Sequence, residues 1–116
     1  MRMMEVKILG VTLKAALLNP KVAKKFEEHL TYTLNEMDKA QECESGAEGI
    51  ERQCNAVIAL MDDIFGAGSA KKVLGEETDL LTCLEALRDI VFLNQEQVVP
   101  VINGLRVIPK DRQGEE

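Results

Sequence analysis

The apolar pattern of residues 47–65 restricts the fold more than any other feature of this sequence. Apolar side chains recur there, mostly at steps of three and four residues, at Ile50, Cys54, Val57, Ile58, Met61, Ile64 and Phe65. This spacing is typical of a helix with one apolar side, and such a side is stable only when it packs against other elements. We therefore predict a helix over 47–65 that faces a core.

A second long helix is predicted before this segment. Asn19 is a favoured N-cap residue and Pro20 is a favoured first helical residue, because the N–H that proline lacks has no partner at that position. The apolar spacing that follows predicts a helix over 20–44. Ser45 and Gly46 then break this helix, and Ser45 is a suitable N-cap for the helix at 47–65.

A third long helix is predicted after a glycine-rich stretch. Glycines interrupt the helical pattern beyond residue 65 and leave room for one short helix at 69–74. Thr78 is a plausible N-cap for a Leu-rich helix over 78–97. Its apolar side is expected to consist of Leu80, Leu81, Leu84, Leu87, Val91 and Phe92.

The N-terminus has the alternating pattern of a strand pair. Residues 5–9 alternate polar and apolar side chains, Gly10 follows, and Val11 and Leu13 continue the alternation. A β-hairpin is the favoured interpretation, and a frayed arm is the alternative. The predicted fold class is mainly α, with a three-helix core, a short additional helix and a small β-hairpin or β-like terminal segments.

The last residues differ from the rest, so we divide the chain into a helical domain at 1–97 and an apolar, turn-rich tail at 98–116. Pro100 and Pro109 are expected to exclude a helix there, which leaves a second hairpin or a segment that docks on a partner. The candidate partner-binding residues are Val98, Val99, Val101, Ile102, Leu105, Val107 and Ile108. The alternative is that these side chains complete the core.

Charge and hydropathy exclude several classes of function. A formal net charge of −6 repels the phosphates of nucleic acids, and only four Phe and Tyr residues, with no Trp, are present to stack on bases. No apolar run has the length of a signal peptide or of a membrane span. We therefore expect a protein of the cytoplasm that binds neither nucleic acid nor membrane.

Residues that usually carry catalysis or bind metals are few and scattered. His29 is the only histidine, and no Ser or Cys nucleophile lies at helical spacing from it. Cys43, Cys54 and Cys83 form neither a CxxC pair nor a zinc-type cluster. The stretch at 65–72 lacks the spacing of a P-loop. We therefore expect no enzymatic activity, no cofactor and no metal ion.

The glycine-rich stretch carries a family resemblance. The run FGAGSAKKVLG at 65–75, followed by LLTCLEAL at 80–87, resembles a pattern in small proteins of long-tailed phages and prophages of Gram-positive bacteria. That pattern is a helix ending in F-G-x-G, a short helix ending in F-G or L-G, and a Leu-rich helix. Ala67 stands where a Glu is familiar, and Leu74 where an aromatic residue is. The resemblance covers residues 1–97, and about twenty-five of them carry its specific part.

Proteins with this pattern are similar to tail assembly chaperones, which are encoded near the tape-measure protein and bind it during tail construction. The resemblance therefore implies a protein partner, a phage tail component such as the tape-measure protein, in the cytoplasm of a bacterial host. One rival is a small structural virion or connector subunit that forms a ring or another homo-oligomer. Another is a regulatory module that binds a nucleotide at the loop around Gly66 and Gly68.

Overall fold

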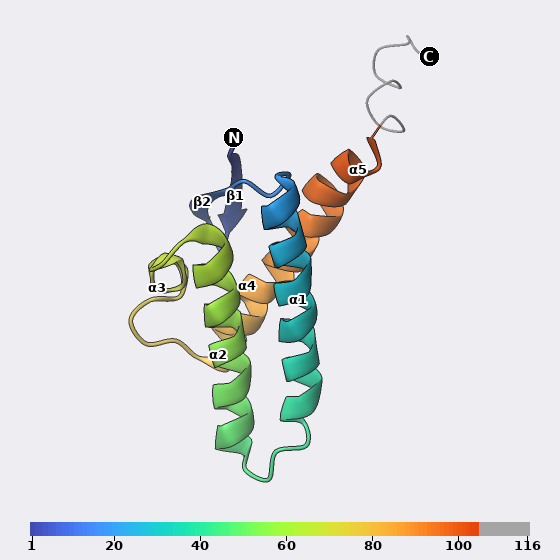
Figure 1. Cartoon of the computed structure of the whole chain (residues 1–116). Coiled ribbons are helices and arrows are strands. Elements are labelled where there is room, and N and C mark those ends of the chain that lie inside the picture. The colour runs from blue at the N-terminus through green and yellow to red at the C-terminus, as the bar shows by residue number, and fades with distance from the viewer. Residues whose placement is uncertain (105–116) are drawn as a thin grey trace.

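The computed structural model describes residues 1–104 of the 116-residue chain. It is mainly helical with a small antiparallel sheet at the N-terminus, as the sequence predicts. The elements are β1 (Met4–Ile8), β2 (Val11–Ala15), α1 (Pro20–Ala40), α2 (Gly46–Phe65), α3 (Ser69–Leu74), α4 (Leu80–Leu93), the π-helix η1 (Asn94–Val98) and α5 (Val99–Ile102). Figure 1 shows α1 and α2 as an antiparallel pair, with α4 crossing behind them and the sheet near one end.

The predicted hairpin is confirmed, and it is fastened to α4. Strands β1 and β2 pair in an antiparallel register in which Val6 faces Leu13. Leu9 and Gly10 form the tight turn with φ values of 50° and 82°, as a two-residue hairpin loop requires. The N–H of Leu9 donates to a carboxylate oxygen of Asp89 on α4 at 2.9 Å, which holds this turn against the helix.

The predicted caps of the first two long helices are confirmed. The Asn19 side chain accepts two backbone N–H groups of the first turn of α1, at 3.0 and 3.2 Å. Ser45 does the same for α2, at 3.1 and 3.3 Å. The predicted end of the first helix at 44 is wrong, since α1 ends at Ala40. Residues 41–45 are needed to reverse the chain so that α2 can lie alongside α1 (Figure 1).

The core lies where the sheet, α3 and α4 cover one part of the α1–α2 pair. The side chains most completely removed from solvent come from nearly every element and include Ile8, Leu17, Phe26, Val57, Leu60, Met61, Ile90 and Val98. Most of the apolar stripe at 47–65 faces this core, as predicted. Ile50 does not, because it lies near the start of α2 and is 46% exposed.

The predicted apolar side of α4 needs correction. The helix buries Cys83, Ala86, Leu87, Ile90 and Leu93, whereas three residues of the predicted side, Leu81, Leu84 and Phe92, are exposed. The sequence could not decide this, because α4 is apolar on nearly all sides and its periodicity selects no single face. Its cap is also one residue later than predicted, since Asp79 accepts the N–H of Thr82 at 2.8 Å.

The chain after α4 remains helical, which corrects two further predictions. The third helix does not stop near Gln97, and Pro100 does not exclude a helix, because η1 and α5 extend the helical path to Ile102. Pro100 lies in the first turn of α5, where the missing N–H costs little. Residues 98–102 are therefore not part of a second hairpin. Figure 1 shows α5 at the end of this path, pointing away from α2.

Candidate functional site

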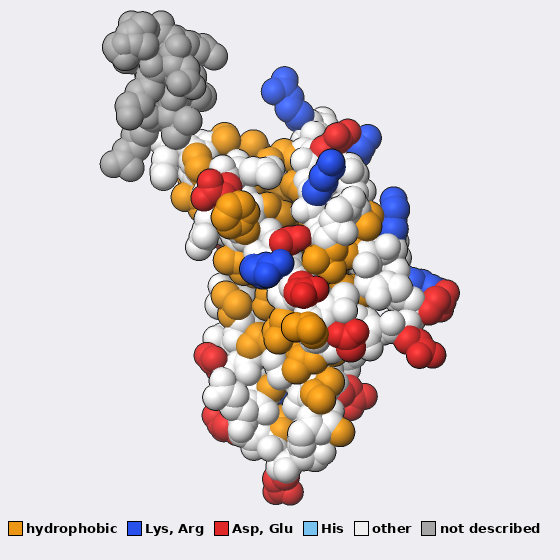
Figure 2. All heavy atoms as spheres, turned by 180° about the vertical axis from the view of Figure 1, so that it is seen from behind, with side chains coloured by type: hydrophobic (Ala, Val, Ile, Leu, Met, Phe, Trp, Pro, Cys, Tyr) orange, Lys and Arg blue, Asp and Glu red, His pale blue; other side chains and the backbone are white. Residues whose placement is uncertain are grey.

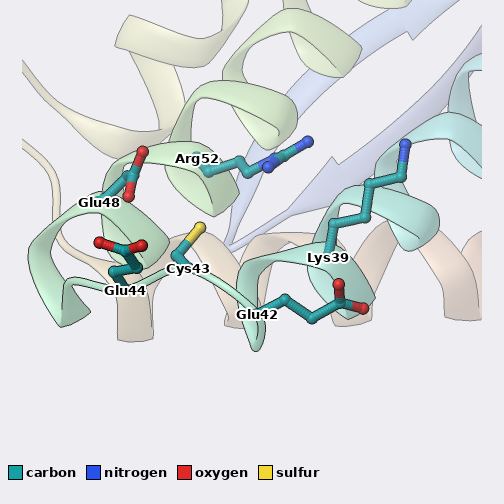
Figure 3. Close-up of a pocket in the computed structure, with 6 residues that line it drawn as sticks. All are labelled: Lys39, Glu42, Cys43, Glu44, Glu48 and Arg52. Atoms are coloured by element: carbon teal, nitrogen blue, oxygen red, sulfur yellow. The ribbon is translucent and has the colours of Figure 1, made fainter.

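The turn between α1 and α2 forms an open hollow of about 610 Å³ with mixed charge. Its lining consists of Lys39, Glu42, Cys43, Glu44, Glu48 and Arg52. Figure 3 shows the carboxylates of Glu44 and Glu48 close together near the Cys43 thiol, with the Lys39 side chain on the opposite side. Because three acidic and two basic side chains line this hollow, it has no strong preference for a ligand of one charge.

An ion pair beside this hollow joins the two helices. Arg52 donates from Nε to one oxygen of Glu36 at 2.6 Å and from Nη2 to the other at 3.4 Å. The hydrogen bonds from Arg52, assisted by the charges of Arg52 and Lys39, lower the pKa of Glu36, although burial acts in the opposite direction. The Glu36 side chain is only 9% exposed, so Arg52, together with Lys39 at 4.0 Å from the same carboxylate, replaces the solvent that burial removes.

His29 has a partner that the sequence analysis missed. Its Nε2 atom lies 2.6 Å from a carboxylate oxygen of Asp63 on α2, and the Tyr32 ring lies perpendicular to the imidazole with the ring centroids 6.2 Å apart. The other ring nitrogen, Nδ1, is buried without a hydrogen-bond partner. Within residues 1–104, Asp63 is the only side chain that hydrogen-bonds to this imidazole. The geometry is that of a bridge between α1 and α2, and only knowledge of how these helices pair could have indicated it.

The glycine-rich loop has a structural use in this fold. Gly66 ends α2 with a φ of 105°, and Gly68 precedes α3 with a φ of 90°. Residues with a Cβ atom rarely adopt such positive φ values, whereas glycine does so easily. A carboxylate oxygen of Asp62 accepts the N–H of Ala70 at 2.9 Å. The Asp62 carboxylate therefore occupies the N-terminus of α3, which is the position where a nucleotide phosphate would have to bind.

The predicted partner-binding residues fall into three groups. Val98 is 2% exposed and completes the core, as the alternative interpretation holds. Val99, Val101 and Ile102 are 39%, 45% and 55% exposed and form an apolar end of the helical path that we call the arm. The other three, Leu105, Val107 and Ile108, lie outside the described residues. The division between 97 and 98 falls inside η1.

The outer side of α4 is a second apolar surface, which the sequence analysis placed in the core. Leu81, Leu84 and Phe92 lie on it, and a groove of about 350 Å³ runs between this side and Leu34 of α1. Figure 2 shows the molecule from behind, with hydrophobic side chains gathered along its middle and charged groups of both signs among them. Such a surface is a candidate site for binding a protein.

The described part of the chain holds neither a metal-type cluster nor a membrane-spanning helix. Among residues 1–104, no three His, Cys, Asp or Glu side chains are grouped so that they could hold a metal ion. The helices of this part of the chain are too short or too polar to cross a lipid bilayer.

Comparison with known proteins gives a family but no activity. No curated protein and no solved structure matches the chain. Residues 9–105 match a family described as "Family of unknown function (DUF6673)". This match takes in β2 and the described helices from α1 to α5, including the outer side of α4, whereas β1 precedes it. The chain therefore belongs to the DUF6673 family.

Proposed function

We propose that the protein is a non-enzymatic tail assembly chaperone of a long-tailed phage or prophage. In this role it binds an apolar segment of another tail protein, the tape-measure protein, in the bacterial cytoplasm until assembly. The arm supplies the contact through Val99, Val101 and Ile102, together with the apolar residues that follow in the sequence.

The exposed arm is the observation that carries this proposal. Within residues 1–104, α5 makes its main contacts with η1, the segment directly before it. Three of the four side chains of α5, all of them aliphatic, are therefore exposed. Figure 1 shows α5 projecting away from α2 and the sheet. Exposed apolar side chains of this kind mark sites that another protein covers. The acidic net charge of −6 would help to keep the complex in solution.

Co-expression with the neighbouring tail genes, followed by affinity capture and mass spectrometry, tests the proposal. Val101→Asp combined with Ile102→Asp places two carboxylates on the arm without touching a core residue. A truncation after Gln97 is less informative, because it also removes the buried Val98. Ile50→Asp is the matched control, since Ile50 is 46% exposed and Val101 is 45% exposed.

The proposal predicts that the wild type and the Ile50→Asp control retain a long helical tail protein, and that the arm variant loses it. Capture that is unaffected by the arm variant would remove the arm from the proposal. Absence of any captured tail protein, combined with a ring in solution, would favour the structural virion or connector subunit, whose distinguishing property is a closed assembly of many copies.

A further inference from the structure

The outer side of α4 presents apolar side chains at regular helical steps. Leu81 and Phe92 are 66% and 62% exposed, and Leu84 between them is 38% exposed. Residues 81, 84, 88 and 92 are three or four positions apart, so their side chains lie along one side of the helix. The opposite side carries Ile90 and Ala86, both fully buried. Within residues 1–104, no element covers this outer side, and the hydrophobic surface is visible in Figure 2.

The spacing of four side chains along this surface is symmetric about its centre, and the two inner side chains have opposite charges. Glu85 and Arg88 lie between the two outer apolar residues, so the series reads apolar, acidic, basic, apolar at 81, 85, 88 and 92. The steps are four, three and four residues, and the midpoint falls between 86 and 87. When two such helices lie antiparallel across a twofold axis at this midpoint, Leu81 of each copy meets Phe92 of the other. Glu85 of each copy then meets Arg88 of the other.

The two charged groups are available for this pairing. Arg88 is 73% exposed, and its one ion pair within residues 1–104 is a long contact of 3.9 Å with its neighbour Asp89. Glu85 takes part in none of the ion pairs formed within the same residues. Two copies of a protein with a net charge of −6 repel each other in general, and opposite charges that face each other across an interface offset this repulsion. The outer side of α4 provides two such contacts.

We propose that the outer side of α4 is the interface of a twofold symmetric homodimer in which the two α4 helices lie antiparallel. The stretch from 81 to 92 spans about 18 Å of helix, and the groove beside Leu34 adds apolar surface next to it. An interface of this size lies toward the small end of those in stable complexes, so the dimer forms in a concentration-dependent manner. The arms lie beyond the paired stretch and remain free at opposite ends, so this dimer does not depend on the proposed chaperone function.

Reciprocal charge reversals test the interface. In Glu85→Arg, two arginines face each other at each contact, and in Arg88→Glu two glutamates do. Each variant alone is expected to weaken dimerisation by at least about tenfold, measured by sedimentation equilibrium over a concentration series. An equimolar mixture of the two places arginine opposite glutamate at both contacts, so it is expected to recover a heterodimer. Glu51→Arg on α2 is the control, because it makes the same change of charge at an exposed position outside the interface.

If net charge alone controlled association, Glu85→Arg would strengthen the dimer. Glu85→Arg reduces the net charge from −6 to −4, which lowers the general repulsion between copies, yet the proposed contact predicts a weaker dimer. Circular dichroism melting confirms that each variant is folded before its mass is measured. The proposal is overturned by a wild type that stays monomeric up to millimolar concentration, by a dimer that neither single variant weakens, or by a mixture that does not associate.

Discussion

Two regions of the α1–α2 pair are built differently. In the body, where the sheet, α3 and α4 cover these helices, large side chains such as Phe26, Leu60 and Met61 are almost completely buried. At the distal end, which we define as residues 34–53, the only buried residues are Glu36, Ala40 and Gly49. Figure 1 shows why, since most of the distal end extends beyond α4, and only its first residue, Leu34, borders the groove beside that helix.

The difference identifies what stabilises each region. Burial of apolar side chains stabilises the body, with about 1.5–3 kcal/mol for each large aliphatic or aromatic side chain. The distal end buries none of these completely, and only Met37 packs partly against the core, so this end depends largely on the Glu36–Arg52 ion pair and on the close approach of Gly49 to Ala40. The body should therefore respond strongly to loss of apolar volume, and the distal end to changes in charge and backbone contact.

The largest expected effect compares the same substitution in both regions. Ile90→Ala removes a side chain that is 0% exposed in the body, and we expect a loss of about 2–5 kcal/mol in the free energy of unfolding. Ile50→Ala removes a side chain that is 46% exposed at the distal end, and the expected loss is below about 1 kcal/mol. Urea unfolding of both variants measures the difference, and equal losses would show that the distal end is covered in solution.

A second comparison probes the backbone contact at the distal end. A Cβ atom added at Gly49 would lie 3.0 Å from the carbonyl oxygen of Ala40, so α1 and α2 would have to separate slightly. We expect Gly49→Ala to destabilise the fold by about 1 kcal/mol, because the overpacking outweighs the gain in helix propensity. Gly46→Ala is the control, since nothing lies within 4 Å of its added Cβ atom. A stabilised Gly49→Ala variant would mean that the two helices yield easily.

The third expected effect is a pH dependence of stability, which arises from Glu36 at the distal end. Because hydrogen bonds from Arg52 lower the pKa of Glu36 below its usual value of 4.5, the folded state binds the proton more weakly than the unfolded state. The stability from this ionised group is therefore present above pH 4.5 and is lost as the pH falls through the lowered pKa. We expect the melting temperature of Glu36→Gln to lie below that of the wild type most clearly at pH 7.

At acidic pH the two melting temperatures should converge, because Glu36 of the wild type is then protonated as well. Ile90→Ala provides the contrast, since its defect in the body involves no titratable group and should persist over the same pH range. A difference for Glu36→Gln that is constant from pH 7 to pH 3 would contradict the assignment of this stability to the ion pair.

Local chemistry explains how much of the fold could be predicted from the sequence. The starts of α1 and α2 were predicted correctly because the caps Asn19 and Ser45 act on the first turn of their own helix. The hairpin and α3 were predicted because glycines mark the turns beside them. Each of these signals operates within a few residues, so a single sequence contains all the information that is needed.

Features that depend on distant contacts were missed. The apolar residues of α4 surround the helix, so only its position against α2 and β1 decides that Ile90 is inside and Phe92 outside. The bridge between His29 and Asp63 joins residues 34 positions apart and has no local signal. Of the candidate binding residues, the sequence located the exposed arm but also included Val98, whose burial depends on how η1 packs.

The smallest perturbation uses the three cysteines as reporters of the two regions. Cys43 lies at the distal end and is half-buried, whereas Cys54 and Cys83 are buried. Burial, with a contribution from Cys83, raises the pKa of Cys54 from 9.0 to about 11, so at pH 8 its thiolate fraction is lower by roughly a hundredfold.

Because the thiolate is the reactive form, a disulfide reagent should modify Cys43 rapidly and leave the other two until the chain unfolds. Mass spectrometry of the labelled peptides gives each rate separately, with Cys43→Ser as the control that removes the rapid phase. Rapid labelling of Cys83 would mean that α4 separates from the body in solution, and the contrast between a closed body and an open distal end would then fail at the helix that carries the proposed interface.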